Sequence, residues 1–343
     1  MDIVFVLYDG IDHSIFESQV FNPLLKLART KSYKKINIVS FEPNISEKLK
    51  QKIAMYETAC PAVSFFVIQR TFFIGSFFLN YEIYKLKKLL KLFKKSYVLY
   101  ARGPLAGFIA KRAITSFCAS ITIQARGLLA EEYAYIHKNA SYWKKPFIFL
   151  RLWQLKSIEC HAYKELLTLP FYIESVSTAL TDYLYSTYNI NKNICTEPKY
   201  DAPKPITESF KKKWRTIKKN QLAIPDSAVV YVYNGSLKPW QCINETMIMF
   251  KTIWQQNKNA IFVGLTTEPH LLKTMLITMN LPEESYRVLS VPAHDMLHYL
   301  CIADYGFLLR EKHILNWVSR PTKLLEYQSV GITIIHNNTI ALL

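Results

Sequence analysis

The chain has 343 residues, half of them hydrophobic, and its 43 Lys and Arg against 26 Asp and Glu give a formal net charge of +17. This length suits two domains of ordinary size. The six cysteines form no CxxC pair, which argues against a disulfide framework or a zinc site and favours reduced core cysteines of a cytosolic protein. The positive charge calls for an anionic partner, and both nucleic acid and an anionic membrane qualify.

Apolar runs and helical stretches alternate along the chain in the manner of an α/β protein. The first run, residues 3–8, follows a start without the basic leader and cleavage site of a signal peptide. Further strands are expected at residues 36–41, 97–101, 120–125, 171–176, 229–233, 260–264, 287–291, 305–309 and 332–335. The sequence therefore predicts two doubly wound, Rossmann-like domains, residues 1–195 and 206–343, which are joined by a Pro-rich linker at 196–205 and face a cleft.

Polar residues follow several strands of the first predicted domain, where ligands of such sheets bind. Gly10 comes directly after the first strand, and His13 lies in the same loop. Arg102 and Arg126 each precede a glycine at the end of a later strand. We therefore treat these four residues as candidates to face the cleft. A structural ion pair between Arg126 and Glu131 is the alternative.

Residues 62–95 are aromatic and basic. In the first part, residues 62–79, a central arginine makes a transmembrane span unfavourable, so shallow insertion of its phenylalanines into a membrane surface is expected. These are Phe65, Phe66, Phe72, Phe73, Phe77 and Phe78. The helix predicted around Lys85–Lys95 has one apolar face, and the rest is basic. It predicts either a membrane-surface helix or a core helix with a solvated lysine face, and a second basic run at 211–219 predicts an exposed helix.

The loop at residues 233–241 follows the first strand of the second predicted domain. Gly235 would allow a phosphate to approach the backbone closely, and Lys238 could neutralise its charge. A plain turn with an exposed lysine is the alternative.

The segment at 304–331 predicts an anion-binding site. A buried strand ends near Arg310, and Pro321 suits the first turn of a helix whose free N–H groups would point at a ligand. Thr322 and Lys323 would add hydrogen-bond donors and positive charge, and Glu326 could accept hydrogen bonds from a sugar. The set suits a nucleoside diphosphate-sugar, although an ordinary β-loop-α unit remains the alternative.

The same segment carries a family resemblance. Leu-Arg-Glu at 309–311, Asn316, Pro-Thr-Lys at 321–323 and Glu-Tyr at 326–327, before Gly331, closely resemble the nucleotide-sugar site of family 4 glycosyltransferases of GT-B fold, especially bacterial ones that build surface polysaccharides. The loop at 233–241 resembles that family's glycine-containing turn. One of the family's two glutamates corresponds to Glu326, whereas the other falls at Val318, where Glu311 or Asn316 could substitute.

The resemblance implies a metal-independent hexosyl- or glycosyltransferase that needs no cofactor. It would move a sugar, with retention, from a nucleoside diphosphate-sugar to a glycan or lipid-linked acceptor on the cytoplasmic face of the membrane, and would bind no nucleic acid. Lys238, Arg310 and Lys323 would stabilise the leaving diphosphate, while Gly10, Gly235, Thr322 and Glu326 would hold the rest of the sugar donor. The acceptor-side candidates are the loops that carry His13, Arg102 and Arg126.

Two other classes of function stay open. A GT-B relative that is an epimerase or an inactive partner subunit would bind a nucleotide without transfer. A nucleic-acid-binding protein would explain the charge, but no helix-turn-helix, RNP or zinc-finger signature is present. His294 and His298 lack a third metal ligand at useful spacing, and GxSxG, Walker A and GxGxxG motifs are absent. Few residues follow the last strand, so the second domain is expected to be cut short at its end.

Overall fold

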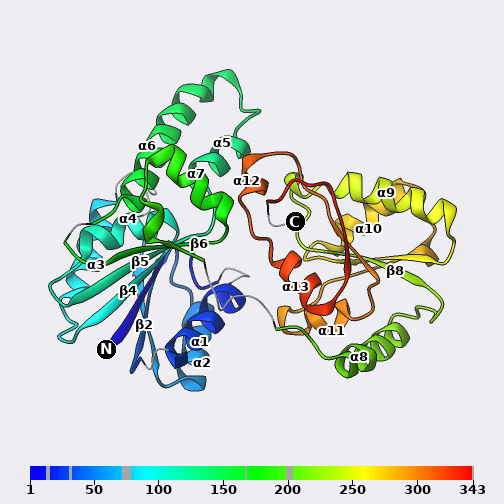
Figure 1. Ribbon diagram of the computed structural model, residues 1–343, viewed down its shortest axis with the longest axis horizontal. Helices are drawn as coiled ribbons and strands as arrows, with labels where there is room; N and C mark the ends of the chain where they lie inside the picture. Colours follow the sequence, from blue (N-terminus) through cyan, green and yellow to red (C-terminus); the bar gives the residue numbers. More distant parts are fainter. Residues whose placement is uncertain (13–15, 31–32, 72–78, 167, 198–203, 342–343) are drawn as a thin grey trace. The chain divides into compact units, whose positions relative to one another are not determined.

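A computed structural model of the chain describes residues 1–12, 16–30, 33–71, 79–166, 168–197 and 204–341 (Figure 1). The chain divides into two compact units, Met1–Asp201 and Ala202–Leu343. The division falls inside the segment 196–205 that the sequence marks as a linker. Each unit is built around one parallel β-sheet, with helices in the connections between its strands.

The first unit contains a seven-stranded parallel sheet in the order β3-β2-β1-β4-β5-β6-β7. Its strands are β1 (Asp2–Leu7), β2 (Ile36–Glu42), β3 (Val63–Gln69), β4 (Tyr97–Arg102), β5 (Cys118–Ala125), β6 (Phe171–Ser175) and β7 (Cys195–Thr196). The central strands β1, β2 and β4 are buried almost throughout, because helices cover both faces of such a sheet. All five strands predicted here are present, and the sequence missed β3 and β7.

Helices connect these strands, as parallel pairing requires. They are η1 (Glu17–Phe21), α1 (Asn22–Thr30), α2 (Glu47–Ala59), α3 (Asn80–Leu90), α4 (Gly103–Ala113), α5 (Leu129–Ile136), η3 (Tyr142–Lys144), α6 (Lys145–Tyr163), α7 (Thr178–Tyr188) and η4 (Lys192–Ile194). Ser46 and Ser177 cap α2 and α7 by accepting hydrogen bonds from the N–H groups of Leu49 and Leu180.

The prediction of membrane insertion for residues 62–79 is wrong for the phenylalanines that the structure describes. Phe65 and Phe66 belong to β3, an edge strand of the sheet. The Phe65 ring stacks on Tyr56 with centroids 6.0 Å apart, and Phe66 meets Phe93 edge to face at 5.5 Å. Phe72, Phe73, Phe77 and Phe78 lie outside the described residues.

The lysine-rich helix α3 turns its apolar face inward. Leu86 and Leu90 are fully buried, whereas Lys87 and Lys88 are exposed. Lys85 donates a 2.8 Å hydrogen bond to the carbonyl of Gln69 at the end of β3. Because the apolar stripe is already used in the core, α3 can offer a membrane its lysine face but not its leucines.

The second unit contains a five-stranded parallel sheet in the order β10-β9-β8-β11-β12. Its strands are β8 (Val229–Asn234), β9 (Ala260–Leu265), β10 (Tyr286–Leu289), β11 (Tyr305–Leu308) and β12 (Thr333–His336). Its helices are α8 (Glu208–Gln221), η5 (Pro239–Gln241), α9 (Ile243–Gln256), α10 (Pro269–Thr278), η6 (Glu283–Ser285), η7 (Ala293–Asp295), α11 (Met296–Leu300), α12 (Ile314–Trp317) and α13 (Thr322–Val330). All five strands predicted here are present.

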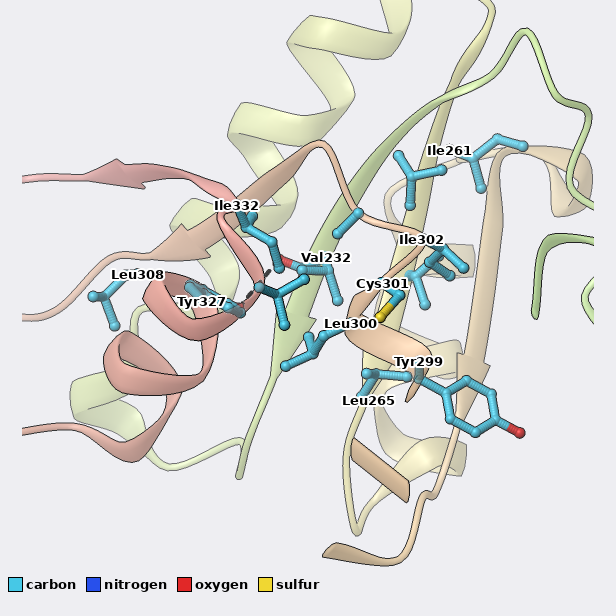
Figure 2. Packing of buried hydrophobic residues seen from close by; sticks show 14 of the residues in the cluster. Val232, Ile261, Leu265, Tyr299, Leu300, Cys301, Ile302, Leu308, Tyr327 and Ile332 are labelled. Carbon is cyan, nitrogen blue, oxygen red and sulfur yellow. Dashed lines mark hydrogen bonds between the residues drawn. The ribbon is translucent and has the colours of Figure 1, made fainter. Parts of the chain in front are cut away.

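One core cluster of this unit joins α11 and α13 to the middle of the sheet (Figure 2). The Tyr327 hydroxyl of α13 donates to the carbonyls of Val232 on β8 and Phe307 on β11, at 3.4 Å each. Its ring lies so close to Gly306 that a Cβ there would come within 2.6 Å of it. Tyr327 therefore fixes α13 across the junction of β8 and β11.

The basic helix α8 is only partly exposed, contrary to expectation. Lys219 is buried and donates to the carbonyls of Pro225, Asp226 and Ala228 at 3.0–3.3 Å. Lys218 is also buried, with its ammonium 4.0 Å from the centre of the Tyr299 ring. Two lysines of this run therefore hold the unit together instead of facing solvent.

Candidate functional site

The strand order of the second sheet reverses between β8 and β11. After β8 the chain continues to β9 on one side, and β11 lies on the other. The two strands pair at Tyr231–Tyr305 and Val232–Gly306, whereas the end of β8 stays hydrogen-bonded to β9 through the N–H of Gly235 and the carbonyl of Leu265. Ligands of open α/β sheets bind at such a reversal, outside the carboxyl ends of the strands.

Lys323 is the most unusual side chain at this point. It lies in the first turn of α13, is 5% exposed, and its Nζ finds no hydrogen-bond partner among the described residues. The ammonium lies 4.2 Å from the centre of the Tyr233 ring, and a Cβ on Gly235 would be 3.6 Å from it. Burial and then the Arg310 charge hold the pKa of Lys323 well below its usual range, with Glu326 opposing.

Arg310 brings a second buried cation to the site, two residues beyond β11. Its guanidinium makes a long 3.4 Å hydrogen bond from Nη1 to the Oδ1 of Asn316, while Nε has no partner in the part of the chain that the structure describes. Asn337 holds its backbone on both sides, accepting from the N–H at 3.2 Å and donating to the carbonyl at 2.7 Å. Burial lowers the pKa of Arg310, but a guanidinium stays charged at any ordinary pH.

Glu326 supplies the carboxylate of the site. Its Oε2 accepts a 2.6 Å hydrogen bond from Nδ2 of Asn234, the last residue of β8. Burial raises the pKa of Glu326, and the hydrogen bond and the Lys323 charge act in the other direction. The Oδ1 of Asn234 is buried without a partner in the described ranges. Donors and acceptors therefore lie together at the end of β8.

The remaining candidates in this unit are more exposed. Lys238 lies in the loop after β8, with its Nζ 5.0 Å from the centre of the Trp240 ring. Thr322 is exposed and begins α13. Pro321 was expected in the first turn of that helix, but it is the N-cap residue, with extended backbone and no side-chain oxygen to cap the first N–H groups.

Val318 occupies the position of the family's other glutamate, and its side chain lies in the hydrophobic core. Val318 is 1% exposed, so a carboxylate there would be buried. Asn316 donates to the carbonyl of Glu311 at 2.7 Å and accepts from Arg310, so its amide positions the arginine. Sequence reasoning missed Asn234 and Asn337. Asn234 had a readable signal, because it is an amide that ends an apolar strand just before a glycine.

Candidates of the first unit lie at neighbouring strand ends. Gly10 follows β1, Arg102 ends β4 and Arg126 follows β5, and these strands are adjacent in the sheet. Gly10 has φ +90°, and the carboxylate of Glu42 is so near that a Cβ there would come within 2.7 Å of it. His13 lies outside the described residues.

The two candidate arginines of this unit, Arg102 and Arg126, each make an ion pair within it. Arg102 donates to Gln19 at 2.7 Å, and its Nε lies 3.7 Å from the carboxylate of Asp9. Arg126 pairs with Glu174 at 3.0 Å, whereas the sequence had suggested Glu131. The two guanidinium groups therefore tie the ends of neighbouring strands together.

The described residues contain no group of three or more His, Cys, Asp or Glu placed to hold a metal ion. Within the same residues, no helix is both long enough and apolar enough to cross a bilayer.

No family model matches the sequence, and neither does any curated protein. Solved structures do match its fold. Anabaena HepE, solved in complex with UDP, is 13% identical with a TM-score of 0.66 over 100% of this chain and 82% of its own. WaaG, a glycosyltransferase of lipopolysaccharide biosynthesis, is 10% identical with a TM-score of 0.64 over 98% and 81%.

Sucrose-phosphate synthase from Thermosynechococcus elongatus is 12% identical, with a TM-score of 0.66 over 100% of this chain and 82% of its own. These likenesses establish that the chain has the α/β GT-B fold, with two Rossmann-like domains. The fold predicted from the sequence is therefore confirmed.

Proposed function

We propose that this protein is a glycosyltransferase, of the family 4 type found in bacterial surface-polysaccharide synthesis. It transfers a sugar, with retention and without a metal ion, from a nucleoside diphosphate-sugar to a glycan or lipid-linked acceptor. HepE, which shares the fold, was solved with UDP, and another structure of it contains UDP and glucose. We place the protein on the cytoplasmic face of a membrane, peripherally bound.

One observation carries the proposal: two buried cationic side chains with unsatisfied hydrogen-bond donors lie at the strand reversal of the second sheet. The Nζ of Lys323 and the Nε of Arg310 lack hydrogen-bond partners among the described residues. Buried charged groups are normally paired, because leaving such a group unpaired costs several kcal/mol. A diphosphate supplies both the charge and the oxygen acceptors that these groups lack.

The same groups would also promote the reaction. Breaking the bond between sugar and diphosphate increases the negative charge on the phosphate oxygens. Lys323 and Arg310, held in a water-poor site, bind that charge more strongly in the transition state than in the ground state. Lys238, in the exposed loop after Gly235, adds a third cation, and the first turn of α13, including Thr322, adds N–H groups.

We assign Glu326 to the ribose of the nucleotide. Its carboxylate, which Asn234 orients at 2.6 Å, can accept hydrogen bonds from two neighbouring hydroxyls. In the first unit we place the acceptor at the strand ends that carry Arg102 and Arg126, and we keep Gly10 as a donor-binding candidate. Because both arginines are held in ion pairs there, we expect them to shape the acceptor loops.

The test is a thermal-shift screen of UDP-, GDP- and CMP-sugars, followed by titration of the one that stabilises the protein. Arg310→Ala and Lys323→Ala should each weaken binding by about 1.5–3 kcal/mol, the range for hydrogen bonds to charged groups. Unchanged binding in both variants would remove the proposed site. Transfer to an added acceptor, followed by NMR of the new anomeric centre, then tests activity and retention.

A further inference from the structure

The first half of α6 and the short η3 helix before it expose a row of large aromatic and apolar side chains. Trp143 is 84% exposed, Phe147 74%, Phe149 73% and Trp153 66%. Tyr142 and Leu150 are exposed as well. Large aromatic side chains normally lie in a core or an interface, because each buries a large apolar area. We call residues 142–153 the aromatic tip.

The tip is exposed because only the second half of α6 packs on the unit. The buried residues of the helix begin at Leu155 and continue through Ile158, Glu159, Ala162 and Tyr163. Its last turn is held by Lys111 of α4, which donates to the carbonyls of His161 and Ala162 at 2.6 and 3.3 Å. Figure 1 shows the beginning of α6 pointing away from the sheet of its unit. A helix that is apolar on all sides needs an apolar environment, and the described residues of its own unit leave the tip exposed.

The charge around the tip indicates what that environment is. From residue 133 to residue 158 the sequence contains no Asp or Glu. Five cations occur in the same stretch: Lys138, Lys144, Lys145, Arg151 and Lys156. Lys144 and Lys145 are exposed within the tip, and Lys145 lies 5.6 Å from the centre of the Tyr142 ring.

We propose that the aromatic tip inserts into the headgroup region of an anionic lipid bilayer. Trp and Tyr favour that region, because one end of each ring system is apolar and the other can stay hydrated. Phe147, Phe149 and Leu150 add apolar area that enters the acyl boundary, while the lysines meet anionic headgroups. A protein partner would have to be acidic and apolar at once, whereas an anionic bilayer combines the two properties over its whole surface.

The tip gives a location to the membrane association proposed above, but it is tested without sugar transfer. None of its residues belongs to the candidate nucleotide site, so either proposal can fail while the other holds. It also differs from the lysine face of α3, where Leu86 and Leu90 are buried. The tip combines exposed tryptophan and phenylalanine side chains with charge, whereas α3 exposes two tyrosines beside its lysines.

The test compares two variants of the full chain in vesicle sedimentation, using phosphatidylcholine with and without phosphatidylglycerol. The tip variant carries Trp143→Ser, Phe147→Ser, Phe149→Ser and Trp153→Ser. The matched control carries Tyr81→Ser and Tyr84→Ser, which remove two aromatic side chains, 53% and 60% exposed, from α3 of the same unit. Because all six residues are exposed, both variants should fold, and circular dichroism checks this.

The wild type and the control should bind anionic vesicles equally, and the tip variant should bind at least about tenfold more weakly. Brominated lipids should quench part of the wild-type tryptophan emission, and that quenching should disappear in the tip variant. Equal binding of all three proteins would overturn the proposal. The proposal would also be overturned if the wild type did not bind anionic vesicles at low salt. The same holds if sedimentation velocity showed that the wild type forms dimers and the tip variant does not.

Discussion

Replacing Lys323 by methionine should make the empty protein more stable and the nucleotide complex weaker. The change keeps the length of the side chain and removes the buried ammonium. An unpaired buried donor costs about 1–3 kcal/mol. The ammonium is 4.2 Å from the Tyr233 ring, and losing a desolvated cation–π contact of that kind costs about 1–2 kcal/mol. The central values differ by about 0.5 kcal/mol in favour of the variant, which for a unit of this size raises the melting temperature by about 1–2 °C.

Affinity should change in the opposite direction. Losing one charge-assisted hydrogen bond to the diphosphate costs about 1.5–3 kcal/mol, so the dissociation constant of UDP should rise roughly ten- to hundredfold. Calorimetric titration measures this loss, and a thermal melt without ligand measures the gain in stability. A gain in the stability of the empty protein together with a loss of UDP affinity would indicate that Lys323 is buried for ligand binding.

Lys212→Met is the matched control, because Lys212 is an exposed lysine of α8 in the same unit. It removes the same charge from the surface, so neither the melting temperature nor UDP affinity should change measurably. The reasoning is refuted if Lys323→Met melts lower than the wild type and still binds UDP normally. That result would make the lysine a structural group, stabilised by its contact with Tyr233.

Three further predictions concern buried charges. Burial and the Arg310 charge lower the pKa of Lys323 in the empty protein, and phosphate oxygens would raise that pKa again. UDP binding should therefore take up protons, and UDP affinity should fall as pH rises above the free-state pKa of Lys323. Equal calorimetric heats of binding in buffers of different ionisation enthalpy would contradict this. Glu326→Gln should weaken UDP about tenfold but leave 2′,3′-dideoxy-UDP unaffected, and an equal loss for both ligands would disprove a ribose contact. Burial raises the pKa of Glu159 to about 7, above its unfolded value, so its carboxyl contributes stability below pH 4.5 that is lost as pH rises through 7. Glu159→Gln should therefore remove about 3 kcal/mol of the pH dependence of unfolding, measured by urea melts between pH 5 and 8. An unaltered pH dependence in the variant would show that Glu159 is not its source.

Sequence patterns predicted the strands of both sheets well, because buried parallel strands form short apolar runs bounded by polar turns. The same rule explains the failure at β3. Its run of Val63–Gln69 contains two phenylalanines and leads into Arg70, so composition could not distinguish an edge strand from a segment that inserts into a membrane surface. The two-residue β7 is too short to have a pattern of its own.

The site was predictable in its residue types but not in its contacts. Arg310, Lys323 and Glu326 lie close together in the sequence, and the helix start after a buried strand marked them. Asn234 meets Glu326 across 92 positions, and Asn337 holds Arg310 across 27. Such pairs depend on which strands become neighbours, and no local pattern encodes that. The burial of Lys323, which carries the functional argument, likewise follows only from the packing of α13 on the sheet.

The contact between Gly306 and Tyr327 constrains how this sequence can evolve. A methyl group at position 306 would overlap the tyrosine ring, and a smaller ring at 327 would lose both carbonyl contacts that join β8 to β11. Neither position can change alone without disturbing the helix that carries Lys323 and Glu326. Homologues should therefore show the two positions substituted as a pair, with a larger residue at 306 accompanied by a smaller one at 327.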